Sequence, residues 1–141
     1  MTDTDFAVSR NLFTYDQKLV GEMFRAGVPM LAGTDAGNPY CFPGFSLHDE
    51  LALLVESGVS SLGALQAATR SAAIFMDAAD KYGSVTPGRI ADLVLLAADP
   101  LADIHNTTKI AEVLSGKEFD RTALDQMLKT AEALAKRDSA K

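Results

Sequence analysis

The stretch Val28–Pro39 constrains the fold more than any other part of the chain, because an apolar run there ends in a single carboxylate. Residues 30–33 are small or apolar throughout, which is typical of a strand covered on both faces. Asp35 lies just past the end of this run, where α/β folds place ligands and catalytic groups. Gly33 and Gly37 flank it and permit backbone conformations that a Cβ would block. The stretch therefore predicts a buried strand that delivers Asp35 to the mouth of a sheet.

Length and composition favour one compact, soluble domain. The chain has 141 residues, of which 48% are hydrophobic, and this is enough for a buried core. Its net charge of −6 argues against non-specific nucleic-acid binding, and its single cysteine fits a reducing compartment. No apolar run approaches the roughly 18 residues that span a bilayer, and the acidic start 1–5 is unlike a signal peptide. We therefore expect a cytoplasmic protein without a nucleic-acid or membrane partner.

Apolar periodicity and capping residues predict an α/β segment over 1–80, a small β element over 81–119 and a C-terminal helix with its tail over 120–141. The first expected helix covers about 15–26 with Thr14 as N-cap, and the second runs from its cap Ser46 to Gly58. The apolar stripe of the second helix consists of Leu47, Leu51, Leu54 and Val55. The remaining helices run from the cap Ser60 through Ala68, over a short turn at 71–79, and over 121–136 with Asp120 or Thr122 as cap. The expected strands cover 28–33, Val85, 91–96, 110–114 and 118–119.

Five segments occur in an order that is more specific than any one of them. They are Leu-Ala-Gly-Thr-Asp-Ala-Gly at 31–37, Pro-Gly-Phe-Ser-Leu-His-Asp-Glu-Leu at 43–51, Leu-Gln-Ala-Ala-Thr at 65–69, the run from Gly83 to Leu96, and Asp-Pro-Leu-Ala-Asp-Ile at 99–104. Together they resemble the C-terminal third of the metal-dependent amidohydrolase family, in its imidazolonepropionase- and prolidase-like branch. The resemblance covers about residues 15–136.

The resemblance implies a (β/α)₈, or TIM, barrel that binds one or two divalent metals at its C-terminal face, zinc being the expected metal. It also implies a small β-sandwich built from both chain ends. Residues 1–80 would then be the C-terminal segment of the barrel, and 81–119 would be part of the sandwich. The implied fold class is thus an incomplete barrel segment followed by a small β element and a helix.

The resemblance also implies roles for particular side chains. Asp35 matches the carboxylate that ends the last barrel strand, ligates metal and handles the proton of the attacking water. His48 lies in the loop or first helical turn where the family contacts substrate, and Asn38 and Tyr40 are candidates to line the same pocket. Each has an ordinary alternative, since His48 could be a solvated first-turn residue and Asn38-Pro39 is first of all a turn signal.

The departures from the family pattern concern the metal site. The His-x-His pair of the first strand, the bridging lysine and two later histidine ligands have no counterpart, and the only histidines are His48 and His105. A catalytic metal needs about three protein ligands, and a whole barrel takes roughly 250 residues. We therefore expect a piece of an amidohydrolase, such as a truncated reading frame, an expressed domain or one component of a split enzyme, which is inactive alone. Cys41 is expected to be an inert thiol and His105 to be exposed and structural.

The sequence leaves two possible functions open. In the first, the complete enzyme hydrolyses a carbon–nitrogen bond of a small cyclic amide, peptide-like or amidine substrate. In the second, the chain is a non-catalytic assembly module, because the strands at 28–33 and 91–96 are too apolar to be solvent-facing edges. The partner would be a second copy or a complementary barrel chain, and an oligomer is expected in either case.

Overall fold

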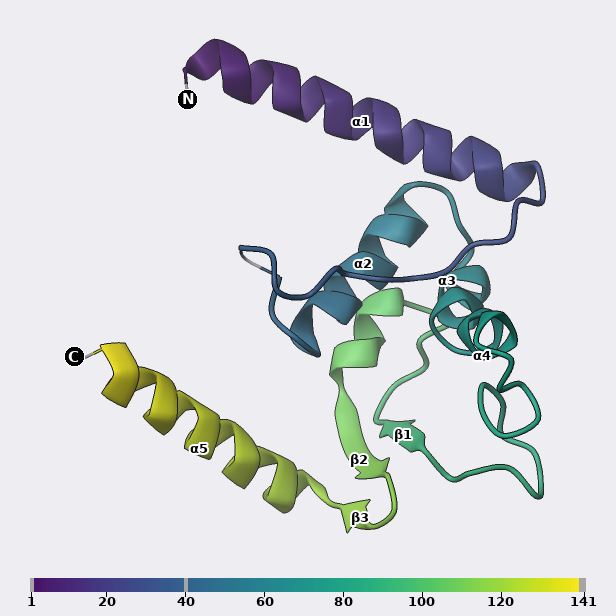
Figure 1. The fold of residues 1–141 in the computed structure, drawn as a ribbon, viewed down its shortest axis with the longest axis vertical. Helices are drawn as coiled ribbons and strands as arrows, with labels where there is room; N and C mark the ends of the chain where they lie inside the picture. Colours follow the sequence, from purple (N-terminus) through teal and green to yellow (C-terminus); the bar gives the residue numbers. More distant parts are fainter. Residues whose placement is uncertain (1, 40, 140–141) are drawn as a thin grey trace.

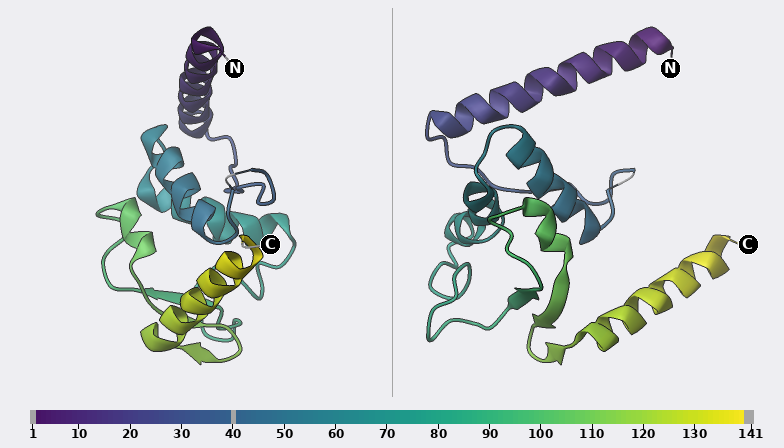
Figure 2. Two further views of the ribbon diagram at one scale, coloured as in Figure 1. Left: turned by 90° about the vertical axis from the view of Figure 1, so that its left-hand side faces the viewer. Right: turned by 180° about the vertical axis from the view of Figure 1, so that it is seen from behind.

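The structure is a computed structural model that describes residues 2–39 and 41–139. Four helices come first, namely α1 (Asp3–Arg25), α2 (Phe45–Glu56), α3 (Ser61–Ala68) and α4 (Arg70–Phe75). They are followed by β1 (Leu93–Leu96), the 3₁₀ helix η1 (Ile104–Thr108), β2 (Ile110–Leu114), β3 (Glu118–Phe119) and α5 (Arg121–Ser139). Figures 1 and 2 show α1 and α5 extending outward from a central body made of the remaining elements.

A small apolar cluster holds this body together. Its buried members come from α2, α3, the turn between them and η1, and they are Leu51, Leu54, Val59, Ala64 and Ile104. The cluster confirms the apolar stripe expected on α2 and joins the helical part of the chain to the part that carries the sheet. Val20 and Phe24 of α1 pack against it from outside, which fixes the C-terminal end of α1 to the body.

The prediction of a β-strand over 28–33 is wrong for this chain, although the segment is extended (Figure 1). No other strand of the described residues lies beside it, and a strand exists only through hydrogen bonds to a neighbour. The Ala32 N–H donates instead to the Ala67 carbonyl oxygen at 3.3 Å, and the Gly33 N–H donates to Glu50 Oε1 at 3.3 Å. The segment is therefore anchored to α2 and α3 rather than to a sheet.

Exposure nevertheless alternates along this segment as it does along a strand. Met30, Ala32 and Thr34 are partly buried, whereas Leu31, Gly33 and Asp35 are exposed. Met30 and Ala32 pack against the apolar cluster. One face of the segment thus lies on the helices, and the other face is open.

The sheet has the order β1-β2-β3 and is antiparallel throughout. Leu93 pairs with Leu114 and Val113 pairs with Phe119, and an irregularity shifts the register between Leu95 and Leu96. The strands expected at 110–114 and 118–119 are confirmed, and β1 occupies the last four residues of the expected 91–96 run. Val85 is not in a strand; it lies in the loop before β1 with its side chain 85% exposed.

Two helix starts differ from expectation because other residues supply the caps. α1 begins at Asp3, where Thr2 and Asp5 form a capping box, while Thr14 lies inside the helix and its hydroxyl donates to the Arg10 carbonyl oxygen. α2 begins at Phe45 with Gly44 as N-cap, two residues before the predicted cap Ser46. The caps predicted at Ser60 and Asp120 are confirmed by their side chains, which accept hydrogen bonds from the Gly63 and Ala123 N–H groups, respectively.

The chain exposes more surface than a compact protein of its size. Its accessible surface is 10282 Å², whereas a folded monomer of 15.0 kDa has about 7,000 Å². The excess of roughly 3,000 Å² includes many large apolar side chains on α1, α5 and the 28–31 segment. Among the described residues, no helix has the length and apolar character needed to cross a membrane.

Two glycines with nearly the same backbone conformation should differ in their tolerance of a side chain. Gly83 has φ of 86° and Gly88 has φ of 88°, but a Cβ on Gly83 would lie 2.7 Å from Ala73 Cβ, whereas nothing lies within 4 Å at Gly88. Gly83→Ala should therefore lower the free energy of unfolding by about 1–3 kcal/mol more than Gly88→Ala. Urea titration of both variants measures the difference, and equal losses would contradict the packing at Gly83.

Candidate active-site segment

Asp35 lies in a tight turn at the end of the extended segment, and its side chain is exposed. Its φ of 48° is in the left-handed region, which aspartate tolerates better than most residues. Asn38 Nδ2 donates to Asp35 Oδ2 at 2.6 Å, and the Asn38 N–H donates to the Asp35 carbonyl oxygen at 3.3 Å. The Asp35 carboxylate is therefore bonded to Asn38 through Oδ2, and the side chain is otherwise exposed to solvent.

The direction of the segment is set by Glu50, a residue that the sequence analysis did not single out. Its carboxylate on α2 accepts the Gly33 N–H two residues before Asp35. Since Met30 and Ala32 hold the other face of the segment against the helices, the turn at Asp35 is supported from one side only. The acidic pair Asp49-Glu50 was visible in the sequence, but nothing there indicated a partner 17 residues earlier.

The donors present do not fit a complete metal site. Among the described residues, no group of three or more histidine, cysteine, aspartate or glutamate side chains could hold a metal ion. The nearest polar side chain bonded to Asp35 is the amide of Asn38, which adds no charge. A divalent metal needs about three protein ligands, so Asp35 could be at most one donor of a set that this part of the chain does not complete.

The hydrogen-bond partner of His48 is a residue of η1, whereas a substrate contact beside Asp35 was expected. It lies in the first turn of α2, partly buried, and its Nδ1 is 3.1 Å from Thr107 Oγ1 on η1. The only hydroxyl proton of Thr107 is donated to the Ile104 carbonyl oxygen at 2.9 Å. In this arrangement Thr107 accepts a hydrogen bond from the Nδ1–H of His48.

His48 and Thr107 also line a cavity of about 510 Å³ between α2, α3, β1 and the loop that precedes β1. Most of its wall is apolar and includes Leu51, Val85 and Ile90. Asp35 and Asn38 do not line it. The structure thus brings Asp35 and Asn38 together and sets His48 apart at the junction of the helices with the sheet.

The remaining candidates add little to the site. Tyr40 lies outside the described residues. Cys41 is partly buried, and its N–H donates to the Asn38 carbonyl oxygen at 3.1 Å as part of the turn. His105 is exposed, as expected, and its Nδ1 lies 2.8 Å from Asp103 Oδ1.

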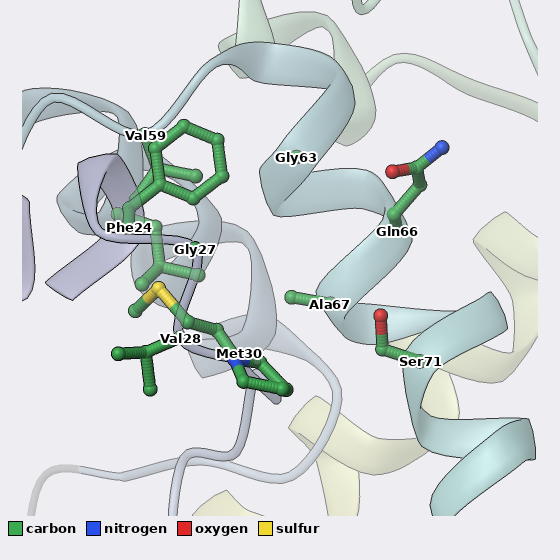
Figure 3. A pocket seen from close by; sticks show the side chains of 11 residues that line it. Phe24, Gly27, Val28, Met30, Val59, Gly63, Gln66, Ala67 and Ser71 are labelled. Carbon is green, nitrogen blue, oxygen red and sulfur yellow. The ribbon is translucent and has the colours of Figure 1, made fainter.

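A second, smaller cavity of about 210 Å³ lies between the end of α1, the 27–30 segment and α3 (Figure 3). Phe24, Val59 and Met30 form its apolar side, and the amide of Gln66 points away from them. No titratable side chain lines this cavity. It is therefore a packing gap between helices rather than a place for acid–base chemistry.

Comparison with known proteins gives a consistent assignment. Residues 6–123 match the model of the Amidohydrolase family. A solved structure of molinate hydrolase superposes with a TM-score of 0.67 at 30% identity over 72% of this chain. A Xaa-Pro dipeptidase with bound methionine in its active site superposes with a TM-score of 0.67 at 28% identity over 74% of this chain. A putative adenine deaminase of Picrophilus torridus is 25% identical over 88 residues, or 62% of this chain.

These matches cover only a part of each relative. The chain spans 25% of the two solved structures and 14% of the deaminase. The expected fold class is confirmed: helices and a small antiparallel sheet form part of the fold of these relatives. The 28–35 segment keeps one exposed face and pairs with no strand of the described residues.

The His48–Thr107 contact can be tested with two neighbouring threonines. Thr107→Val removes the acceptor for His48 and the donor for the buried Ile104 carbonyl group, which should lower the free energy of unfolding by about 1–3 kcal/mol. Thr108→Val is the control, because its exposed hydroxyl makes a similar bond to the His105 carbonyl oxygen, and it should cost under about 1 kcal/mol. Chemical denaturation compares them, and a larger loss for Thr108→Val would refute the assigned network.

Asp103 is expected to make a pH-dependent contribution to the stability of the fold. The His105 side chain and then its backbone N–H donate to this carboxyl group and hold its pKa below the ordinary value of about 3.9. A lowered pKa in the folded state stabilises the fold above the unfolded-state pKa, and this contribution is lost as the pH falls through the folded-state pKa.

The melting temperature of Asp103→Asn should therefore lie below that of the wild type near neutral pH, and the gap should close below about pH 4. Asp49→Asn, which changes an exposed carboxylate on α2, is the control and should show no such closing gap. A difference in melting temperature that widens as the pH falls would contradict the expected stabilisation by the ionised Asp103 side chain.

Proposed function

Because the chain belongs to the amidohydrolase family, we propose that it supplies the C-terminal part of an active site that hydrolyses a carbon–nitrogen bond. The observation that carries the proposal is the open face of the 28–35 segment, which leads to the exposed Asp35 carboxylate. Met30 and Ala32 fix the opposite face, so a partner surface can approach only from the side of Asp35. The length of the matched relatives supports an active site shared with a segment outside this chain.

Asp35 is proposed as the acid–base residue of that site. A carboxylate within hydrogen-bond reach of an attacking water can take its proton and pass it to the leaving nitrogen. The donation from Asn38 leaves one side of Asp35 open, and this supports such a role. Asp35 would also be one ligand of a divalent metal, with zinc as our choice, and the other ligands would lie outside the described part of this chain.

The proposed substrate is a small cyclic amide, a peptide-like molecule or an amidine. The relatives carry the names molinate hydrolase, Xaa-Pro dipeptidase and putative adenine deaminase, and this range of names supports a family-level substrate class. Asn38, beside Asp35, is the proposed substrate contact with the best structural support. Tyr40 and His48 remain proposed contacts, and the position of His48 at the α2–η1 junction favours a supporting role.

A second candidate function is that of a non-catalytic assembly module. Its support is the roughly 3,000 Å² of surface beyond that of a compact monomer, together with the position of the 28–35 segment, which pairs with no strand of the described residues. The partner in this case is a complementary chain that adds a strand to the open edge. This candidate and the first can both hold, because a completing chain would also complete the active site.

The activity proposal predicts that the purified 141-residue chain hydrolyses no amide or dipeptide substrate, with or without added zinc. Coexpression with a molinate hydrolase that lacks its C-terminal quarter should restore turnover. Asp35→Asn should then lower kcat by about 100-fold or more, since general acid–base catalysis contributes at least this much.

Asp49→Asn is the control, because it removes an exposed carboxylate of the same charge from α2 and should leave kcat unchanged. Zinc-dependent turnover by the chain alone would refute the shared active site. Restored turnover that survives Asp35→Asn would refute the role of Asp35.

A further inference from the structure

Helix α1 carries two separate apolar stripes. At about 100° per residue, Phe6, Phe13, Val20 and Phe24 fall on one line, which we call the inner stripe. Val8, Leu12, Tyr15, Leu19 and Met23 fall on a second line about 120° away, which we call the outer stripe. Asp5, Ser9 and Asp16 lie between the two stripes. A helix with two apolar faces needs two partner surfaces.

The inner stripe already has a partner in this chain. Val20 and Phe24 pack against the apolar cluster, and the Phe24 ring lies so close to Gly63 that a Cβ there would be 2.9 Å from it. Phe6 and Phe13 continue the same line beyond the body.

The outer stripe has no partner in the described part of the chain. Its five side chains are between 38% and 64% exposed, and none of them packs against the apolar cluster. Figures 1 and 2 show α1 meeting the body only near its C-terminal end, so most of the helix stands clear. Burying apolar side chains of this size stabilises association by about 25 cal/mol for each Å² removed from water.

The spacing of the outer stripe suits a second helix of the same kind. Val8, Leu12, Tyr15 and Leu19 follow one another at intervals of four, three and four residues, which is the heptad seam of paired helices. Polar residues flank the seam, including Asn11 and Lys18 on one side. Each partner of a standard interface buries about 800 Å², and the outer stripe is one part of the roughly 3,000 Å² by which the whole chain exceeds the surface of a compact monomer.

We propose that the outer stripe of α1 pairs with the outer stripe of a second copy in antiparallel orientation. This register places Val8 of one copy opposite Leu19 of the other, and Leu12 opposite Tyr15. Since each body is attached at the C-terminal end of α1, antiparallel pairing puts the two bodies at opposite ends of the helix pair. Antiparallel pairing also brings the positive N-terminal end of each helix dipole near the negative C-terminal end of the other. The proposal does not depend on the hydrolase activity.

Sedimentation equilibrium on the full chain tests the interface. The wild type should be a dimer at micromolar concentration, and Leu12→Glu/Leu19→Glu should be a monomer with unchanged helix content. Ala7→Glu/Thr14→Glu is the matched control, because it adds the same charge at two exposed positions of α1 that lie outside both stripes, and it should remain a dimer. A monomeric wild type would overturn the proposal, and so would association that persists in Leu12→Glu/Leu19→Glu, which would indicate pairing through another surface.

Cysteine cross-linking tests the orientation in a Cys41→Ser background. Under oxidation, a mixture of Val8→Cys and Leu19→Cys chains should form the mixed disulfide in preference to either homodimer. Preferential coupling of Val8→Cys to itself would overturn the antiparallel register. Neither experiment measures turnover, so failure here and failure of the proposed hydrolysis are separate results.

Discussion

The packing of Leu51, Leu54, Val59, Ala64 and Ile104 is the interaction on which the rest of the structure depends. These few buried side chains connect α2 and α3 to η1, and through η1 to the sheet. They also provide the surface on which Met30 and Ala32 rest. Without this cluster, the segment that leads to Asp35 would keep only its hydrogen bonds to Ala67 and Glu50, because no strand of the described residues lies beside it.

A cluster of this size is small for 141 residues, and that explains the shape of the chain. Most apolar side chains of α1 and α5 do not reach it and remain exposed. The same shortage leaves one face of the 28–35 segment open. The chain spans about a quarter of its solved relatives, and this length is consistent with the large exposed surface and with the lack of three clustered metal-binding side chains among the described residues.

Local signals predicted much of this fold correctly. The stripe on α2, the Ser60 and Asp120 caps and strands β2 and β3 depend on residues within a few positions of one another. The wrong predictions concern backbone groups whose hydrogen-bond partner is distant in the sequence, or a helix start that the sequence signals only weakly. Thr2 rather than Thr14 caps α1, and the 28–33 run forms no strand because its backbone bonds to Ala67 and Glu50.

For the candidate site, the sequence by itself determined that Asp35 ends an apolar segment and that Asn38 follows within the same turn, because both facts are local. Only the tertiary structure decided that Glu50 anchors the segment and that Thr107, 59 residues along the chain, is the hydrogen-bond partner of His48. Contacts of this kind depend on how helices pack around the shared cluster. No pattern of neighbouring residues encodes them, since packing is decided by the whole set of side chains at once.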